Sequence, residues 1–248
     1  MKSPQWCWAL GVALALVVGP VVAKDAPPSA LELGNQALMA LKNNDVASAA
    51  RWVNEGLRKA PNEASLLELA ALIAERQQQT AVAARHWAHL ALVEPENERL
   101  LRERAGFECR TGDARDGEHA FRVLAERFPE RAAASWLAAA QCAELGKDGI
   151  VATVDYKKVL ELLADDPDAL LGLARIAVGR GQYEAAAKQL NQLLTTVETP
   201  SEEALVLMIR TQKALNHAAM VVRYQGDLMR LFPESKALRS AENEGMAR

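Results

Sequence analysis

Gly112 and Gly117 have the spacing of the two glycines in a phosphate-binding loop, which would hold a nucleotide. Glu118, however, occupies the position where such a loop needs a lysine. The segment also coincides with a turn between two helices of the repeat described below. We therefore interpret both glycines as turn residues and predict no cofactor.

Two other groups of residues could bind a metal ion. His86 and His89 would share one face of a helix, but no third ligand stands at a useful spacing. Asp165, Asp166 and Asp168 have the composition of a calcium loop, yet the remaining ligands of an EF-hand are missing. An acidic turn that caps the next helix explains these aspartates. We predict a solvent-facing histidine pair, a helix cap and no metal site.

Neither the composition nor the motifs of the sequence indicate catalysis or nucleic-acid binding. No recognisable motif places a serine, a histidine and an aspartate together, so we predict that the chain is not an enzyme. The formal net charge is only -3, which gives no long-range attraction to nucleic acid or to an anionic membrane surface. Half of the 248 residues are hydrophobic but only 5% are aromatic, and this balance favours helices over sheets.

The N-terminal residues 1–23 have the features of an export signal. A basic start is followed by an apolar run over 9–18 and by small residues before the cleavage site that we predict after Ala23. Residues 24–29 would form a linker. Because Pro20 interrupts the run before it reaches the roughly 20 apolar residues of a bilayer span, an uncleaved anchor is the weaker alternative. We expect a periplasmic protein, associated with the outer membrane at most through a partner.

Three cysteines bear on lipid attachment and on redox state. Cys7 lies inside the leader and follows Pro4-Gln5-Trp6 instead of the residues of a lipoprotein box, so we expect no lipid there. Export would carry Cys109 and Cys142 into an oxidising compartment. We expect both cysteines near the middle of the first helix of their repeats, which are neighbours. We favour two buried thiols, because equivalent positions in adjacent repeats are usually farther apart than the limit of about 7 Å between disulfide Cα atoms. A disulfide is the alternative.

A period of 34 residues organises most of the chain. Pro61, Pro95 and Pro129 follow one another at this spacing, and each closes a stretch with the same order of apolar and small residues. This is the period of the tetratricopeptide repeat, a pair of antiparallel helices. We predict an all-α tetratricopeptide solenoid over residues 30–248, with about six helix pairs and a capping helix at 235–248.

The same pattern predicts how the repeats pack. Small residues recur where two helices must approach closely, and one large residue fills the gap to the next repeat. We expect Trp87 and Phe121 to be buried fillers of this kind. In the fourth repeat the stretch 150–163 is longer than a standard second helix, so the helix boundaries between 145 and 166 stay open.

The inner groove of such an array is the surface that binds other proteins, and set positions of each first helix line it. The contact residues that these positions predict are Arg99, Arg102, Trp136, Arg175 and Arg210. Their basic side chains would hold a carboxylate-bearing or acidic peptide, with stacking on Trp136. A solvated concave face that binds no partner is the alternative.

Chaperone adaptors built from this repeat grip a terminal carboxylate with lysine and asparagine at set groove positions. In the first repeat those positions hold Gly34 and Leu38. The sequence therefore argues against a chaperone adaptor of that type.

Two runs near the C-terminus carry a family resemblance: ALVLMIR at 204–210, followed by ALN at 214–216, and YQGDLMRLFPES at 224–235. Over about 70 residues from Pro167 onward, the chain resembles the type IV pilus biogenesis and stability proteins of the PilF/PilW family, which are tetratricopeptide pilotins. The resemblance implies a scaffold that helps an outer-membrane secretin to assemble. Family members typically carry a lipidated cysteine at the cleavage site, which this chain lacks.

These observations predict a non-enzymatic exported scaffold that supports type IV pilus biogenesis by binding a secretin or another pilus component. We expect a protein partner and no small-molecule substrate. One alternative is a general periplasmic assembly factor, for example in cytochrome maturation or polysaccharide export. Another is a regulatory subunit of an envelope enzyme.

Overall fold

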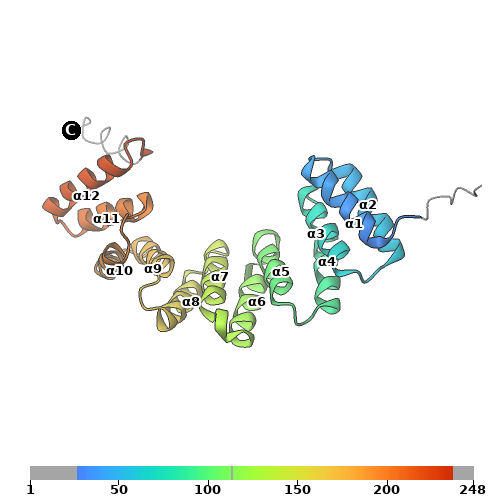
Figure 1. The fold of residues 1–248 in the computed structure, drawn as a ribbon. Coiled ribbons are helices and arrows are strands. Elements are labelled where there is room, and N and C mark those ends of the chain that lie inside the picture. The colour runs from blue at the N-terminus through green and yellow to red at the C-terminus, as the bar shows by residue number, and fades with distance from the viewer. Residues whose placement is uncertain (1–26, 113, 237–248) are drawn as a thin grey trace, which may run out of the picture.

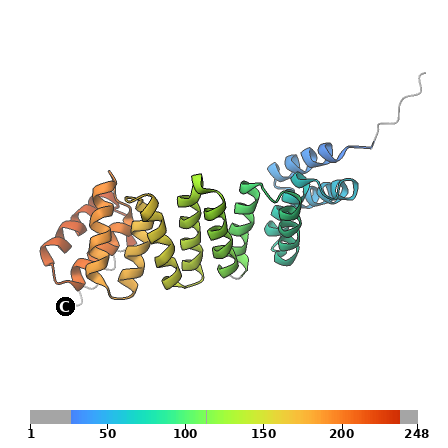
Figure 2. The same cartoon turned by 90° about the horizontal axis from the view of Figure 1, so that it is seen from below.

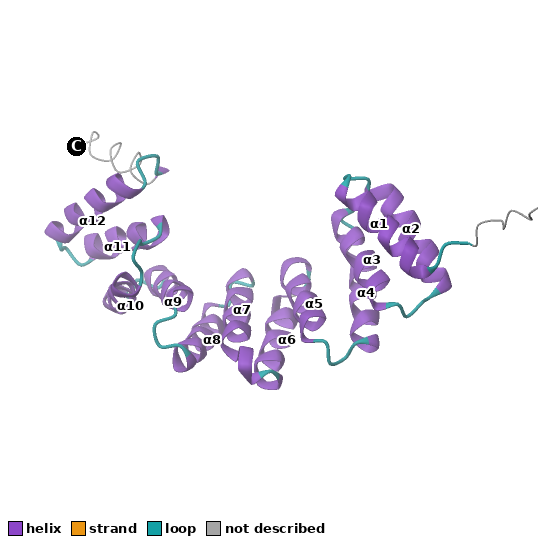
Figure 3. Cartoon of the chain, viewed as in Figure 1, coloured by secondary structure: helices purple, strands orange, loops and turns teal. Residues whose placement is uncertain are grey.

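Residues 27–112 and 114–236 are described by the computed structural model, and they form helices joined by short turns, with no strand among them (Figure 3). The twelve α-helices of this part are α1 (Ala30–Lys42), α2 (Val46–Lys59), α3 (Ala64–Arg76), α4 (Thr80–Val93), α5 (Glu98–Thr111), α6 (Ala114–Arg127), α7 (Ala132–Leu145), α8 (Gly149–Leu162), α9 (Pro167–Gly179), α10 (Tyr183–Thr196), α11 (Glu202–Ala214) and α12 (Ala218–Leu231). A short 3-10 helix, η1 (Pro129–Arg131), precedes α7. The predicted export signal and residues 237–248 of the predicted capping helix lie outside the described residues.

Consecutive helices pack as pairs, α1 with α2 through to α11 with α12, and each pair packs on the next. The pairs follow one another along an arc (Figure 1), and Figure 2 shows the same row from below. In Figure 1, α5, α7 and α9 lie on the inner side of the arc, and α6, α8 and α10 lie on the outer side. The predicted all-α tetratricopeptide-like solenoid is confirmed.

The helix lengths show how regular the array is. Every second helix of a pair, α8 included, has 14 residues. The expectation of a longer helix at 150–163 was therefore wrong. Leu162 and Leu163 extend the apolar pattern of the sequence, but they are 53% and 52% exposed and Leu163 is already the C-terminal cap.

The turns inside the pairs share a backbone feature. Five residues adopt a left-handed backbone with φ between 57° and 71°: Asn44, Gln78, Lys147, Gly181 and Asn216. Each of them precedes the first residue of a second helix by two residues. This conformation reverses the chain tightly, and asparagine and glycine adopt it most easily.

Small residues hold the helices close, as the sequence predicts. The alanines at equivalent places of five first helices are all 0% exposed: Ala37, Ala71, Ala105, Ala139 and Ala174. Trp87 and Phe121 are buried against their neighbours, so their predicted role as fillers is confirmed. The indole nitrogen of Trp87 also donates to Glu75 Oε1 at 2.8 Å.

The interpretation of Gly117 as a turn residue was wrong, although Gly112 does cap the end of α5. Gly117 lies inside α6 and is buried. A Cβ atom at this position would stand 2.6 Å from both the backbone nitrogen and the Sγ of Cys109. Only glycine therefore permits the close approach of α6 to α5.

Cys109 and Cys142 form a disulfide between α5 and α7, with their Cα atoms 5.5 Å apart. The preference for two free thiols was therefore wrong. The two cysteines are 33 residues apart, one fewer than the period of the repeat, so they are not at equivalent positions. They also lie in the last turn of their helices instead of the middle. The one-residue offset brings them within bonding distance.

Candidate partner-binding site

The five predicted contact residues lie on consecutive first helices, which carry them along one side of the solenoid. Arg99 and Arg102 are on α5, Trp136 is on α7, Arg175 is on α9 and Arg210 is on α11. We call the surface that these residues share with Glu68 of α3 the inner face. The four helices that carry them belong to consecutive repeats, which is the arrangement needed to follow an extended peptide.

Arg99 is already engaged by the preceding repeat. Its Nη1 and Nη2 donate to the two carboxylate oxygens of Glu68 at 2.6 and 2.8 Å, in a bidentate pair between α5 and α3. Hydrogen bonding to Glu68 raises the pKa of the Arg99 guanidinium. A second pair nearby, Arg110 with Glu75 at 3.1 Å, joins the same two helices.

Arg102 connects α5 to the following repeat. Its Nη2 lies 2.5 Å from Glu98 Oε1 and donates to the hydroxyl of Ser135 on α7 at 3.0 Å. Ser135 is fully buried and its hydroxyl donates in turn to the carbonyl of Arg131. Arg102 is thus a structural link between two repeats as well as a candidate contact.

Trp136 is half-buried, and the Arg122 guanidinium lies 6.0 Å from its ring centroid. Arg122 also forms ion pairs with Glu118 and, at 2.8 Å, with Asp155. Asp155 is fully buried on α8, and this burial raises the pKa of its carboxyl to about 6, against the opposing effect of Arg122. One half-buried cation therefore faces two carboxyl groups beside the indole.

Arg175 lies at the centre of a network that joins three repeats. It contacts Glu144 of α7 at 2.7 Å and Glu203 of α11 at 2.6 Å. Burial alone would lower the pKa of Arg175, but its two ion pairs outweigh burial and raise it. The hydroxyl of Tyr156 donates to the same Glu144 at 2.5 Å, and Gly172 provides the space for the Tyr156 ring.

Arg210 differs from the other four predicted contacts. Its side chain is exposed, and it forms no ion pair or hydrogen bond with any residue that the structure describes. An incoming carboxylate could bind this guanidinium without displacing an internal partner. Arg210 is therefore the inner-face cation best placed for a first contact.

Sequence reasoning found the arginines of the inner face but did not pair them with carboxylates. Glu68, Glu98, Glu144 and Glu203 each bind one of those arginines. Three of the four pairs join helices about one repeat apart, at separations of 28 and 31 residues. A search for opposite charges at this separation would have identified these glutamates as candidate partners, without showing which pairs form.

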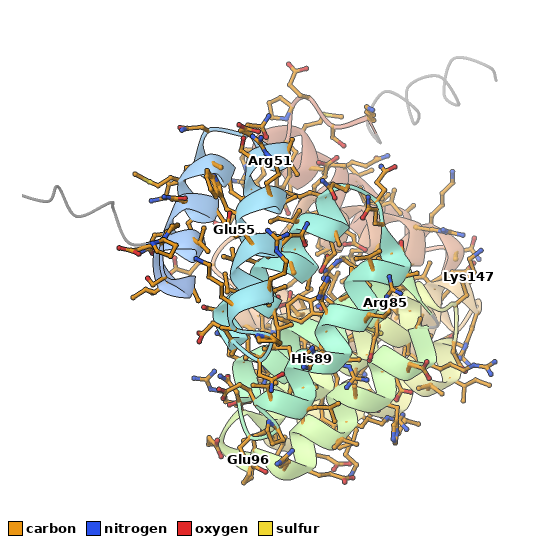
Figure 4. All side chains as sticks on the ribbon, turned by 90° about the vertical axis from the view of Figure 1, so that its right-hand side faces the viewer. Arg51, Glu55, Arg85, His89, Glu96 and Lys147 are labelled. Carbon is orange, nitrogen blue, oxygen red and sulfur yellow. A yellow bond between two sulfur atoms is a disulfide. The ribbon has the colours of Figure 1, made fainter. Side chains whose placement is uncertain are left out.

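The candidate metal ligands have ordinary structural roles. His89, which is labelled in Figure 4, has its Nε2 3.0 Å from Asn62 Oδ1. Both histidines of α4 are half-buried, so they are less exposed than the predicted solvent-facing pair. Burial lowers the pKa of His86, with a further contribution from Arg85. Asp166 accepts from the Ala169 amide at 2.9 Å and caps α9, as predicted. Within residues 27–112 and 114–236, no three His, Cys, Asp or Glu side chains converge as a metal site would need.

Among the described residues, none of the helices combines the length and the apolar character that crossing a membrane requires.

Comparison with known proteins agrees with this architecture. Residues 151–217 match a family model described as a tetratricopeptide repeat. Comparison with curated proteins finds no match for the sequence.

Several solved structures share the fold. PilW, described as a widely conserved type IV pilus biogenesis factor, is 20% identical with a TM-score of 0.64; the match covers 87% of this chain and 99% of that one. PilF of Pseudomonas aeruginosa is 17% identical with a TM-score of 0.60, over 87% of this chain and 97% of that one. The C-terminal part of a repeat protein from Cytophaga hutchinsonii is 12% identical with a TM-score of 0.71, over 86% and 87% of the two chains. At these identities the similarity establishes a common fold. Proteins with this repeat are typically non-catalytic scaffolds that bind other proteins.

Proposed function

We propose that this chain is a non-enzymatic exported scaffold that binds a secretin or another pilus component and thereby supports type IV pilus biogenesis. The observation that carries the proposal is the inner face, where consecutive repeats present polar and aromatic side chains along one side of an arc. Two features support the pilus system in particular: the resemblance over 204–235, and the fold match that spans nearly the whole of PilW and PilF.

The ion pairs of the inner face suit exchange with a partner. Arg99 and Arg175 remain partly exposed while they are paired, with side-chain exposures of 58% and 42%. An exposed ion pair contributes only about 0–1 kcal/mol to stability, so replacing an internal glutamate by a partner carboxylate costs little. Binding would begin at Arg210 and extend along the face by such exchanges, with Trp136 available for stacking.

Export to the periplasm is part of the proposal. The predicted signal at 1–23 would direct it, and the disulfide between Cys109 and Cys142 supports an oxidising compartment, where such bonds persist. Because Cys7 lies inside the predicted signal, we infer that the mature chain carries no lipid at its start. It would then reach the outer membrane through its partner.

The proposal is tested by the amount of assembled secretin multimer in outer membranes of a strain that lacks this chain. Loss of the multimer, restored by the parent chain and less well by Arg210→Glu, supports the proposal. Unchanged multimer and normal pili would contradict it and would favour a general periplasmic assembly factor or a regulatory subunit of an envelope enzyme. Proteins that co-purify with the tagged chain would then distinguish these two alternatives.

A further inference from the structure

A large hollow opens at the turn ends of the third to fifth repeats, away from the start of α5, where Arg99 and Arg102 lie. It has a volume of about 1740 Å³. Its walls come from the last turns of α5, α7 and α9 and the first turns of α6 and α8. The hollow is thus built jointly by three consecutive repeats.

The rim of this hollow exposes large apolar side chains. Leu145, at the end of α7, is 65% exposed, and Ile150, in the first turn of α8, is 72% exposed. Ile176 of α9 is half-buried and lines the same hollow. An aliphatic side chain from a partner would remove this apolar surface from water, which is the main favourable contribution to association.

Lys147 stands between these apolar residues, at a position where its residue type is unexpected. The equivalent turns use the uncharged residues Asn44, Gln78, Gly181 and Asn216 for the same left-handed backbone, and Lys147 adopts it with φ 59°. A lysine is less suited to this conformation than asparagine or glycine. Residues in such backbone conformations cluster at functional sites, so the Lys147 ammonium is a candidate for binding a ligand.

Arg180 provides a second cation in the same hollow. Gly149 lets its guanidinium lie against the first turn of α8, since a Cβ there would stand 3.2 Å from Arg180 Nη2 and 3.6 Å from Ile176 Cγ2. Lys147 and Arg180 are both exposed, and neither forms an ion pair or side-chain hydrogen bond with the described residues. Each ammonium or guanidinium group is therefore available to a ligand.

Among the described residues, none of the four carboxylates that line the hollow forms an ion pair with Lys147 or Arg180. Glu118 pairs with Arg122, Glu144 binds α9 through Arg175, and Asp148 caps α8 by accepting from the Val151 amide. The remaining lining carboxylate, Asp116, belongs to α6 on the other side of the hollow. Beside Leu145 and Ile150, Lys147 and Arg180 are thus cations that have no internal carboxylate partner among the described residues.

We propose that this hollow is a second docking surface, for a segment of a protein partner that carries a carboxylate next to an aliphatic side chain. The carboxylate binds Lys147 and Arg180, and the aliphatic group packs on Leu145 and Ile150. Charge complementarity selects an acidic segment over a basic one. The surface adjoins the inner face at Glu144, which binds Arg175. Its proposed binding groups, on Leu145, Lys147, Ile150 and Arg180, are not those of the inner face, so the proposal does not rest on the function proposed above.

The disulfide prepares this surface for binding. Cys109 lines the hollow, and its bond to Cys142 ties α5 to α7 at a Cα separation of 5.5 Å. Two of the walls are therefore held together before a partner arrives. A surface that is already ordered loses less conformational freedom on binding.

The test uses the full exported chain and a fluorescein-labelled peptide with a central Glu-Leu-Glu between Gly-Ser flanks, followed by fluorescence anisotropy. Peptides with Gln-Leu-Gln or Glu-Ser-Glu at the centre separate the contributions of charge and apolar contact. The hollow is altered by Lys147→Asn, which copies the equivalent turns, combined with Arg180→Gln. Arg85→Gln with Leu92→Ser, at two exposed positions of α4, is the matched control.

The proposal predicts that the double variant of the hollow binds the Glu-Leu-Glu peptide about tenfold or more weakly, because two charged hydrogen bonds are lost. Either altered peptide should also bind less tightly, and the control variant should bind like the parent. No binding by the parent, or equal binding by the hollow variant, would overturn the proposal. Loss of binding in Arg210→Glu with the hollow variant unaffected would place the peptide on the inner face, which overturns the second surface and leaves the proposed function standing.

Discussion

The middle and the C-terminal end of this solenoid use the same helix pairs but are held together differently. From α9 to α12, one continuous apolar cluster runs through two repeats, with Leu170, Leu205 and Met208 among its fully buried members. From α5 to α8, the apolar clusters are smaller, and a disulfide and the buried contacts of Arg122 add to them. One repeat pattern can therefore carry two kinds of interface, and polar or covalent links occur where the apolar core is interrupted.

The largest effect should come from the apolar end. Replacement of Leu205 by alanine leaves a cavity inside the continuous cluster, so we expect the free energy of unfolding to fall by about 2–5 kcal/mol. Chemical denaturation followed by circular dichroism measures the change. Val222→Ala, at a position that is 69% exposed on α12, is the control and should be neutral. Equal stability of Leu205→Ala and the parent would show that the cluster is not what holds this end.

The second-largest effect should come from the disulfide in the middle of the solenoid, which the C-terminal end lacks among its described residues. Cys109→Ala combined with Cys142→Ala opens the link between α5 and α7, and we expect a loss of about 2–4 kcal/mol in unfolding free energy. Dithiothreitol should destabilise the parent by a similar amount and should not affect the double variant. A parent whose denaturation curve is the same with and without reductant would contradict a stabilising disulfide.

A smaller effect depends on pH. The pKa of Asp155 is about 6 in the folded chain and 3.8 in the reference state, so the folded chain binds the proton more tightly. The stabilisation that protonation provides is therefore present at low pH and is lost as the pH rises through about 6.

The unfolding free energy should then be about 1 kcal/mol higher at pH 5 than at pH 7 because of this group. Glu118 and Arg122 face the same carboxyl, so the comparison is made with Asp155→Asn, which retains both. The difference between parent and variant in their pH dependence isolates the contribution of Asp155. Parallel pH profiles would show that this carboxyl does not titrate in the range.

The smallest effect on stability should come from the inner face. Arg99→Ala removes a partly exposed ion pair, so we expect a loss of about 0–1 kcal/mol. Arg210→Ala removes no contact within the described residues and should be neutral within about 0.5 kcal/mol. A large loss in the Arg210 variant would mean that this side chain is structural, which would weaken its assignment as a first contact.

The fold was predictable because it depends on spacing. A 34-residue period, alanines at the close contacts and large fillers such as Trp87 all follow from the packing of helix pairs, and each is present. The disulfide and the end of α8 were missed because they depend on small departures from the 34-residue period. The cysteines are bonded because they are one residue out of register, and Leu163 appears helical although the helix has already ended.

The candidate site was predictable only in part. The groove positions identified arginines on successive first helices, but the partners of those arginines come from other repeats. Whether Arg175 is free or bound to Glu144 and Glu203 depends on how adjacent repeats rotate against each other, which residue types alone do not determine. The hollow beside Lys147 also depends on how the repeats pack against each other, because three repeats together form its walls.

Photo-crosslinking from two positions in cells tests the central claim most directly. A photoreactive amino acid replaces Arg210 on the inner face in one strain and Arg85, an exposed residue of the second helix α4, in another. The account predicts adducts with a secretin or another pilus component from position 210 and none from position 85. Adducts that form equally from both positions, or from position 85 alone, would contradict binding along the inner face.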